Sequence, residues 1–430
     1  MVYRLDTSRA GFSEEFETLL GSKREVSEEV SATVAAILED VRLRGDEAVL
    51  AYTDRFDQLP LTAATLAFSA DEIAEADARI DPDLRAALQV AHDRITAHHE
   101  KQKPLDHIYQ DALGVTLGTV WTAIEAVGIY VPGGTASYPS SVLMNAVPAR
   151  VAGVSRIAMV APTPRGAVNP AVLAAAKIAG VTEIYRIGGA QAVGALAYGT
   201  ATIKPVSKIM GPGNAFVAAA KRQVFGTVGI DMIAGPSEVL IIADSSANPA
   251  WIAADLLAQA EHGGGAQSIL VTTDPELGDG VSAEVDRQIA LLPRAEITRQ
   301  GWDEFGAIII VKSLGEAVEL ANRIASEHVE LMVEDPLALQ PKIRNAGAIF
   351  LGHHTPEAIG DYVGGSNHVL PTARSARYTS GLGVLDFMKR TSILGCDPGS
   401  LAALAPSAVA LAETEGLQAH GRSVSIRLNS

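Results

Sequence analysis

From about residue 125 onward, short apolar stretches alternate with helical patterns, and this alternation constrains the fold more than any other feature of the chain. Residues 126–131 and 156–161 have the length and composition of buried strands, and a helical pattern at 141–152 lies between them. The same alternation continues to about residue 224. Strands that alternate with helices in this way predict a parallel sheet covered by helices on both faces.

Glycine turns follow three of these predicted strands. They lie at 132–135, 188–191 and 211–214. In parallel sheets, ligands bind beyond the carboxyl ends of the strands, which is where Tyr130, Gln191 and Asn214 fall. The closest match to a dinucleotide-binding Gly-x-Gly-x-x-Gly motif, at 211–216, lacks the third glycine. This segment is either a plain tight turn or a loop that places a helix N-terminus near a phosphate.

A second run of alternation begins at residue 238 and predicts a second α/β unit. Beyond about residue 385 the alternation stops, and a mostly helical tail remains. The predicted divisions are an N-terminal helical region that contributes to the first α/β unit, the first unit, the second unit and the tail, at 1–125, 126–236, 237–384 and 385–430.

Charge and cysteine content exclude several classes of protein. The formal net charge is −16 and the chain has no basic run, which argues against nucleic acids and anionic membranes as partners. Residues 1–13 lack the apolar segment of a secretory signal, and the apolar runs have only strand length, so we expect a cytoplasmic protein. The single cysteine, Cys396, excludes an intrachain disulfide and a cysteine-based zinc site. Its turn-like surroundings at 394–399 are typical of an inert surface residue rather than a nucleophile.

A helix that begins near Pro249 and ends at the glycines of 263–265 carries Gln259 and His262 in its last turn. Residues three apart share a helix face, and the small and apolar neighbours predict that this helix is buried. A polar pair at the end of a buried helix must bond a side chain, a ligand or a metal. For an isolated Gln-x-x-His, a core histidine beside a capping amide is the more common explanation, because two possible ligands do not make a metal site.

Four of the ten histidines lie beside acidic or glycine-rich segments, namely His262, His328, His368 and His420. Each alone is typical of a surface or core residue. Together with Asp361 they would supply nitrogen and oxygen ligands for Zn²⁺ and an acid/base pair. The residues by themselves therefore predict an α/β enzyme of two units with a His/Asp metal site, and they do not identify its substrate.

Several long segments resemble the histidinol dehydrogenase family, the enzymes of the last steps of histidine biosynthesis. The strongest matches lie at 130–134, 211–214, 231–238 and 255–262, with further matches at 326–328, 367–372, 380–391 and 415–420. The resemblance covers nearly the whole chain. It implies two incomplete Rossmann-like domains in a homodimer, with NAD contacts in the first domain, most metal and catalytic residues in the second, and a C-terminal tail that reaches the partner's active site.

The resemblance also implies a role for individual residues. The zinc ligands would be Gln259, His262, Asp361 and His420, and the catalytic pair would be Glu327 and His328. The substrate contacts would be Ser237, His368 and Glu415, in addition to His328 and the metal ligands. The NAD contacts would be Tyr130, Gln191 and Asn214. Glycines follow His262 at a position to which the family assigns no role.

The implied reaction is the oxidation of L-histidinol to L-histidine in two NAD-dependent steps, through an aldehyde that stays bound. His328 would remove the alcohol proton and Glu327 would activate water. Two alternatives remain: a dehydrogenase of the same fold that acts on another polar alcohol, and a non-catalytic zinc or small-molecule binding protein. His368 and the tail residues favour an imidazole-bearing substrate over the first alternative, and the Glu327–His328 pair argues against the second. No arginine beside the NAD positions invites a 2′-phosphate, which favours NAD over NADP.

Overall fold

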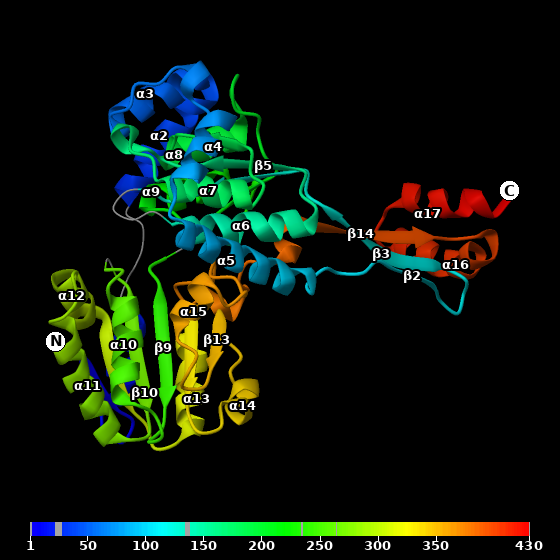
Figure 1. The fold of residues 1–430 in the computed structure, drawn as a ribbon. Helices are drawn as coiled ribbons and strands as arrows, with labels where there is room; N and C mark the ends of the chain where they lie inside the picture. Colours follow the sequence, from blue (N-terminus) through cyan, green and yellow to red (C-terminus); the bar gives the residue numbers. More distant parts are fainter. Residues whose placement is uncertain (1, 22–27, 134–137, 234, 264, 430) are drawn as a thin grey trace.

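The computed structural model describes residues 2–21, 28–133, 138–233, 235–263 and 265–429. The predicted glycine turns at 132–135 and 263–265 include residues 134, 135 and 264, which lie outside these ranges. Two α/β units lie one above the other, and an elongated arm projects sideways from the first unit (Figure 1). Within the described ranges, no helix has the length and apolar composition needed to cross a membrane.

The first unit is built on a five-stranded parallel sheet in the order β6-β5-β4-β7-β8. Its strands are β4 (Ala126–Tyr130), β5 (Arg156–Val160), β6 (Glu183–Tyr185), β7 (Lys208–Met210) and β8 (Gly229–Ile230). The chain runs outward from β4 through β5 to β6 and then returns to the other side of β4 at β7. The sheet therefore has its switch point between β4 and β7, where doubly wound folds bind their ligands.

Helices cover both faces of this sheet, as the alternation predicted. One face packs against α4 (Ala70–Arg79), α5 (Pro82–Glu100), α6 (Pro139–Ala152) and α7 (Pro170–Ile178). The other packs against α2 (Glu28–Arg44), α3 (Asp46–Asp57), α8 (Gly189–Tyr198) and α9 (Ala215–Val224). A capping box begins α4, because Ser69 Oγ accepts from the Glu72 amide at 3.2 Å and Glu72 Oε2 accepts from the Ser69 amide at 2.8 Å.

The second unit has a six-stranded, all-parallel sheet in the order β1-β11-β10-β9-β12-β13. Its strands are β1 (Tyr3–Asp6), β9 (Glu238–Ala243), β10 (Gln267–Thr272), β11 (Gly306–Ile310), β12 (His328–Met332) and β13 (Ala348–Leu351). Because β1 pairs with β11, the first residues of the chain belong to this second sheet and not to the first unit.

Apolar side chains again fill the space between the second sheet and its helices. One face carries α1 (Phe12–Gly21), α13 (Leu314–Ile324) and α14 (Pro336–Leu339), and the other carries α10 (Pro249–Ala260), α11 (Pro275–Ile289) and α12 (Ala295–Phe305). A short helix, α15 (Glu357–Tyr362), follows β13. Asn248 caps α10 by accepting from the Ala250 amide at 2.8 Å, with proline at the first turn as the sequence predicted.

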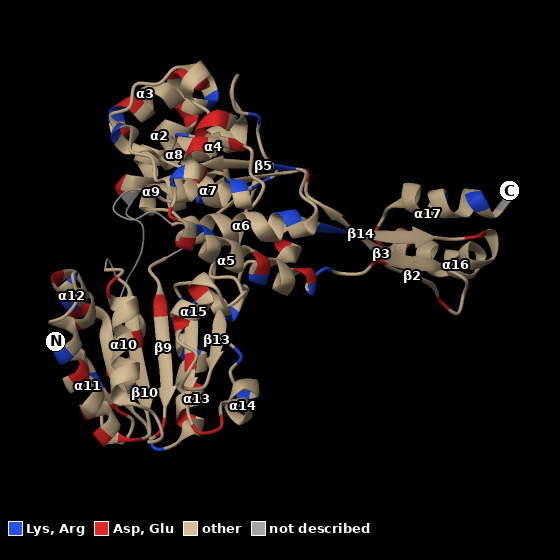
Figure 2. Cartoon of the chain, in the orientation of Figure 1, with Lys and Arg blue, Asp and Glu red and all other residues tan. Residues whose placement is uncertain are grey.

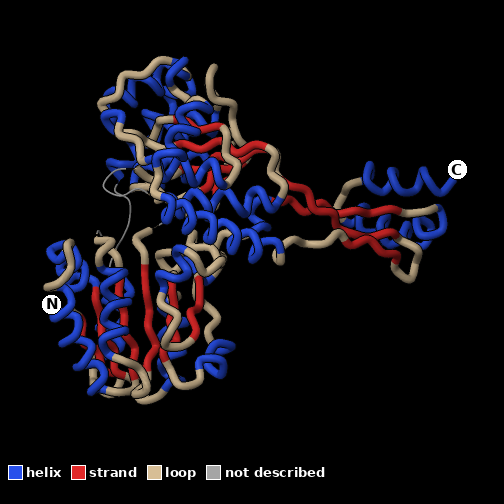
Figure 3. The backbone as a smooth tube through the Cα atoms, in the orientation of Figure 1, coloured by secondary structure: helices blue, strands red, loops and turns tan. Residues whose placement is uncertain are grey.

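The arm contains a three-stranded antiparallel sheet in the order β14-β3-β2, followed by two helices (Figure 3). Its elements are β2 (His107–Gln110), β3 (Thr116–Ala123), β14 (Met388–Gly395), α16 (Pro398–Thr414) and α17 (Gln418–Ser425). The tail is thus mostly helical, as predicted, but β14 was missed. Every residue of β14 is exposed or half-buried, so this strand lacks the buried face that would give it a recognisable apolar pattern.

Candidate active site

A cavity of about 300 Å³ lies between the two α/β units. From the first unit, Pro132 follows β4 and Gly211 follows β7, so the carboxyl ends of that sheet face the cavity. From the second unit, Ser237 precedes β9 and His328 begins β12. The second sheet therefore contributes the amino ends of its strands, an arrangement that the order of elements in the sequence did not reveal.

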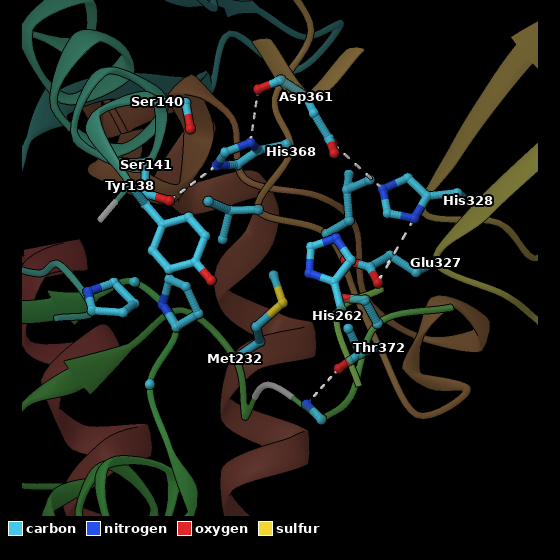
Figure 4. Close-up of a pocket in the computed structure, with 18 of the residues that line it drawn as sticks. Tyr138, Ser140, Ser141, Met232, His262, Glu327, His328, Asp361, His368 and Thr372 are labelled. Carbon is cyan, nitrogen blue, oxygen red and sulfur yellow. Dashed lines mark hydrogen bonds and ion pairs between the residues drawn. The ribbon is translucent and has the colours of Figure 1, made fainter. Parts of the chain in front are cut away.

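His328 is the most enclosed polar group of this cavity, with 3% of the residue exposed. Its Nδ1 lies 3.0 Å from the backbone carbonyl oxygen of Glu238. Because a carbonyl only accepts, the ring proton resides on Nδ1 and the lone pair on Nε2. Nε2 has no hydrogen-bond partner in the described part of the chain and lies 3.9 Å from Asp361 Oδ1 (Figure 4). Burial lowers the pKa of His328 to about 3, so the ring is neutral at ordinary pH and Nε2 is available as a base.

Glu327 lies directly beside this imidazole. It is 5% exposed, and its Oε2 accepts from the backbone amide of Glu238 at 3.0 Å. The same oxygen lies 3.8 Å from His328 Nδ1. Burial raises the pKa of Glu327 well above its usual value, and the negative charges of Glu238 and Asp361 add to this effect. A carboxylate with a raised pKa is a stronger base than an exposed one once it has lost its proton.

Glu357 is a third buried carboxyl group at the cavity, and the sequence analysis did not identify it. It is 4% exposed, and its Oε1 lies 3.4 Å from His328 Nδ1. Ligand atoms of His328, Glu357 and Asp361 lie within 4.8 Å of one another, which is close enough to hold a metal ion. Glu357 and Asp361 are four residues apart on α15, so their shared helix face was a signal that the sequence contained.

Three of the four predicted metal ligands come from the second unit and suit a metal ion. Gln259 on α10 is fully buried, and neither its Oε1 nor its Nε2 has a hydrogen-bond partner among the described residues. Such an amide requires a partner that the described residues do not provide. His262 follows on the next turn and lines the cavity beside Glu327 (Figure 4). Burial raises the pKa of Asp361 to about 6, and a bound cation would reverse this shift.

The imidazole of His368 connects the two units. Its Nδ1 lies 2.9 Å from the backbone carbonyl oxygen of Asp361, and its Nε2 lies 3.3 Å from Ser141 Oγ on α6 of the first unit. Burial lowers the pKa of His368 to about 4, so this ring is also neutral at ordinary pH. Ser237 lines the same cavity beside Glu327. The structure thus brings two of the predicted substrate contacts to one cavity with the Glu327–His328 pair.

The two remaining residues predicted for the active site lie elsewhere in the structure. Glu415 follows the last residue of α16, and His420 is part of α17. Both are exposed, and their helices lie at the far end of the arm (Figure 1). Within one chain, neither residue reaches the cavity between the two units.

The three predicted NAD contacts line a second cavity of about 300 Å³ in the first unit. Tyr130, the last residue of β4, accepts from the Gly189 amide at 2.9 Å, and burial raises its pKa to about 12. Gln191 is 2% exposed, and its Oε1 has no partner in the described ranges. Asn214 caps α9, since its Oδ1 accepts from the amides of Phe216 and Val217, each at 3.1 Å.

Gly189 shows why this turn requires glycine. Its φ is +64°, a conformation that side-chain-bearing residues rarely adopt, and an added Cβ would lie 2.7 Å from Gln191 Oε1. Any larger residue here would displace the Gln191 amide from the cavity.

A buried ion pair holds the loop that separates the two cavities, and the sequence analysis did not identify it. Lys221 and Asp231 pair with side chains that are 3% and 1% exposed. Lys221 Nζ donates to the Gly211 carbonyl at 2.8 Å, and Asp231 Oδ2 accepts from the Gly211 amide at 2.7 Å. Both backbone groups of Gly211 are therefore held, which orients the loop that leads to Asn214.

Comparison with known proteins shows to which family this chain is similar. The family model described as histidinol dehydrogenase matches residues 21–428. The chain is 65% identical to the histidinol dehydrogenase of Agrobacterium fabrum and 63% identical to that of Rhizobium meliloti, covering 100% of this chain and 99% of each relative. The crystal structure of histidinol dehydrogenase from Elizabethkingia anophelis is similar with a TM-score of 0.95 and 37% identity, covering 100% of this chain and 98% of that one.

Proposed function

Because the chain belongs to the histidinol dehydrogenase family, whose members are zinc- and NAD-dependent oxidoreductases of histidine biosynthesis, we propose that the cavity between its two units oxidises L-histidinol to L-histidine. The reaction takes two NAD-dependent steps, and L-histidinaldehyde stays bound between them. The observation that carries this proposal is the buried Glu327–His328 pair in the cavity between the two units, together with a second cavity of about 300 Å³ in the first unit.

The proposed Zn²⁺ ligands are Gln259, His262 and Asp361 of one chain and His420 of a second chain. The bound ion would act as a Lewis acid and as a template that orients the substrate's amine and imidazole. The unpartnered amide of Gln259 and the raised pKa of Asp361 support this assignment.

His328 is the proposed base for the first oxidation. Its Nδ1–H is held by the Glu238 carbonyl, so the ring is fixed with the Nε2 lone pair unpaired. Nε2 accepts the hydroxyl proton of the alcohol while the adjacent C–H hydride leaves, and the alcohol becomes an aldehyde. Tyr130, Gln191 and Asn214 would hold NAD⁺, which would supply the acceptor for that hydride.

Glu327 is the proposed base for the second half of the reaction. Its carboxylate takes a proton from water as the water oxygen bonds to the aldehyde carbon, and the carbonyl oxygen takes up the proton that His328 removed in the first step, which gives the hydrate. The hydrate then loses a second hydride and a proton and becomes the carboxylic acid. No cysteine is needed, in agreement with the exposed position of Cys396.

The proposed substrate contacts are Ser237 and His368 within the cavity and Glu415 from the partner. The carboxylate of Glu415 is suited to pair with the substrate's ammonium group, so its loss should weaken binding more than turnover.

We propose a homodimer in which each arm completes the active site of the other chain. Glu415 and His420 lie on the arm, far from their own cavity (Figure 1). Few residues of the arm are charged (Figure 2), and the arm exposes large apolar side chains. Leu394 is 71% exposed, Leu411 65% and Ile426 56%. An arm that exposes large apolar side chains and has few charges is suited to contact another chain.

We also propose that the chain divides after residues 125, 236 and 384 and that the protein is cytoplasmic. The arm modifies the division, since β3 from the first segment pairs with β14 from the tail. The location follows from the proposed reaction, which draws on a pool of NAD.

The direct test is to add L-histidinol and NAD⁺ to the purified, zinc-loaded protein and to follow NADH by absorbance and L-histidine by chromatography. We expect both products. NADH formation with another polar alcohol but not with L-histidinol would move the assignment to a different dehydrogenase of the same fold. A protein that binds zinc but reduces no NAD⁺ with any alcohol would be a binding protein.

A further inference from the structure

The wall of the second cavity contains a carboxylate to which neither the sequence analysis nor the family assigns a role. Asp57 is the last residue of α3 and lines the cavity together with Tyr130, Gln191 and Asn214. Its Oδ2 is buried and has no hydrogen-bond partner among the residues that the structure describes. Burial raises the pKa of Asp57, and no cation among the described residues offsets this shift.

Helix stability does not explain this residue. A negative charge at the C-terminus of a helix interacts unfavourably with the helix dipole, and α3 ends at Asp57. A buried carboxylate oxygen without a donor is a second unfavourable feature. A ligand with hydroxyl donors would remove this second penalty, so the position is better suited to binding than to folding.

The other walls of the cavity fit a nucleoside. Ile37, Phe56, Pro162 and Phe216 give it apolar sides of the kind that hold a planar base. Its described wall contains no lysine or arginine that would bind an additional phosphate. A ribose presents two adjacent hydroxyl groups, and carboxylates accept hydrogen bonds from such groups in other dinucleotide sites.

The position of this cavity also indicates which half of a dinucleotide it takes. The reactive nicotinamide must reach the first cavity, where His328 lies. The second cavity contains Asp57 but none of the catalytic side chains. Gly213 lines the first cavity and the next residue, Asn214, lines the second, so the two cavities lie on either side of one loop.

We propose that Asp57 accepts hydrogen bonds from the ribose hydroxyls in the adenosine half of NAD, and that its negative charge excludes the 2′-phosphate of NADP. Asp57 is then the residue that determines cofactor specificity. The proposal rests on the proposed function only in taking the second cavity as the cofactor site.

The test is equilibrium binding of NADH and NADPH to the zinc-loaded protein without L-histidinol, followed by the fluorescence of the reduced cofactors and by calorimetry. We expect wild type to bind NADH more tightly than NADPH. D57A loses the acceptor, and because a hydrogen bond to a charged group contributes strongly, NADH affinity should fall by about 10- to 100-fold. D57N removes the charge, so NADPH should bind more tightly than it does to wild type.

Asp54 provides a matched control, because it lies on the same helix but is exposed and does not line the cavity. D54N removes the same charge from α3 and should leave both affinities unchanged. D57E keeps the charge and should still exclude NADPH. Thermal unfolding of each variant verifies that it folds, and we expect D57N to be no less stable than wild type, since it removes an unpaired buried charge.

The outcomes separate this proposal from the proposed function. If wild type binds NADH but D57A and D57N retain its affinity and its preference over NADPH, the role of Asp57 is overturned and the dehydrogenase assignment stands. If D54N and D57N change binding equally, the effect is long-range charge and the proposal also fails. If wild type binds neither dinucleotide, both the cofactor site and the role of Asp57 are wrong.

Discussion

Replacing Asp231 with asparagine tests whether the ion pair beneath the loop at Gly211 holds the fold and the cofactor site together. The side chains of Lys221 and Asp231 are 3% and 1% exposed, so water cannot solvate the positive charge of Lys221 when the negative charge of Asp231 is removed. Removing one member of a buried ion pair costs about 3–5 kcal/mol, since it leaves the other charge unpaired. The substituted amide keeps the shape of the carboxylate but not its charge. The free energy of unfolding should therefore fall by that amount.

The size of this loss makes it easy to measure. A folding unit of about 150–250 residues loses about 2–4 °C in Tm for each kcal/mol, so Asp231→Asn should lower the Tm by at least about 6 °C. Urea unfolding followed by circular dichroism gives the free energy directly. Because Asp231 also accepts from the Gly211 amide, the loop to Asn214 should loosen, and KM for NAD⁺ should rise more than KM for L-histidinol.

Two further variants make the argument refutable. Asp279 pairs with Arg4 at 2.6 Å, but its side chain is 75% exposed, so Asp279→Asn should cost less than about 1 kcal/mol. The double change Lys221→Met with Asp231→Leu removes both charges and should lose less stability than Asp231→Asn. If Asp231→Asn lies within about 1 kcal/mol of wild type, or if the double variant is the least stable, the buried pair does not have the role assigned to it.

Three other predictions concern the active site, the dimer and acid stability. His328→Gln and Glu327→Gln should each lower turnover by at least about 100-fold. The amount of bound zinc, measured by atomic absorption, should stay unchanged. Near-normal turnover in both variants would show that these residues are not part of the mechanism. Inactive His328→Gln protein mixed with inactive His420→Ala protein, under conditions that exchange subunits, should regain part of the activity. If His420 acts in the partner chain, each hybrid dimer contains one intact active site. Verified hybrid dimers without activity would contradict shared active sites. His99 is fully buried, and burial lowers its pKa below 6.5, so the unfolded chain takes up a proton that the folded chain does not as the pH falls below about 6.5. His99→Met should therefore lose less stability than wild type between pH 7.5 and 5.5 in urea titrations, and equal losses in both proteins would refute this assignment.

The helices and strands of the two α/β units could be predicted from the sequence because their apolar faces are buried. The six residues of β9 are all buried, and the strand begins at residue 238, where the second run of alternation was predicted to begin. The arm lacks this signal, since β14 has no buried residue. Pairing between strands that are distant in the sequence could not be predicted either, as the pairing of β1 with β11 in the second sheet shows.

The site could be predicted only in part. The resemblance supplied Glu327 and His328, and the structure adds the reason for their chemistry, which is burial against the Glu238 backbone. Glu357 was missed although its spacing from Asp361 was a signal, and Asp57 was missed because a single acidic residue in a sequence reveals neither its burial nor its missing partners. Burial depends on how the two units meet, and the sequence does not state that the second sheet faces the cavity with its amino ends.

The ratio of NADH formed to L-histidinol consumed tests the central claim most directly. It is measured with zinc-loaded protein at saturating NAD⁺, with the product identified by chromatography. We predict two NADH for each L-histidinol and L-histidine as the product, because His328 and Glu327 serve the two oxidations at one site. One NADH for each L-histidinol, with free L-histidinaldehyde in solution, would contradict it.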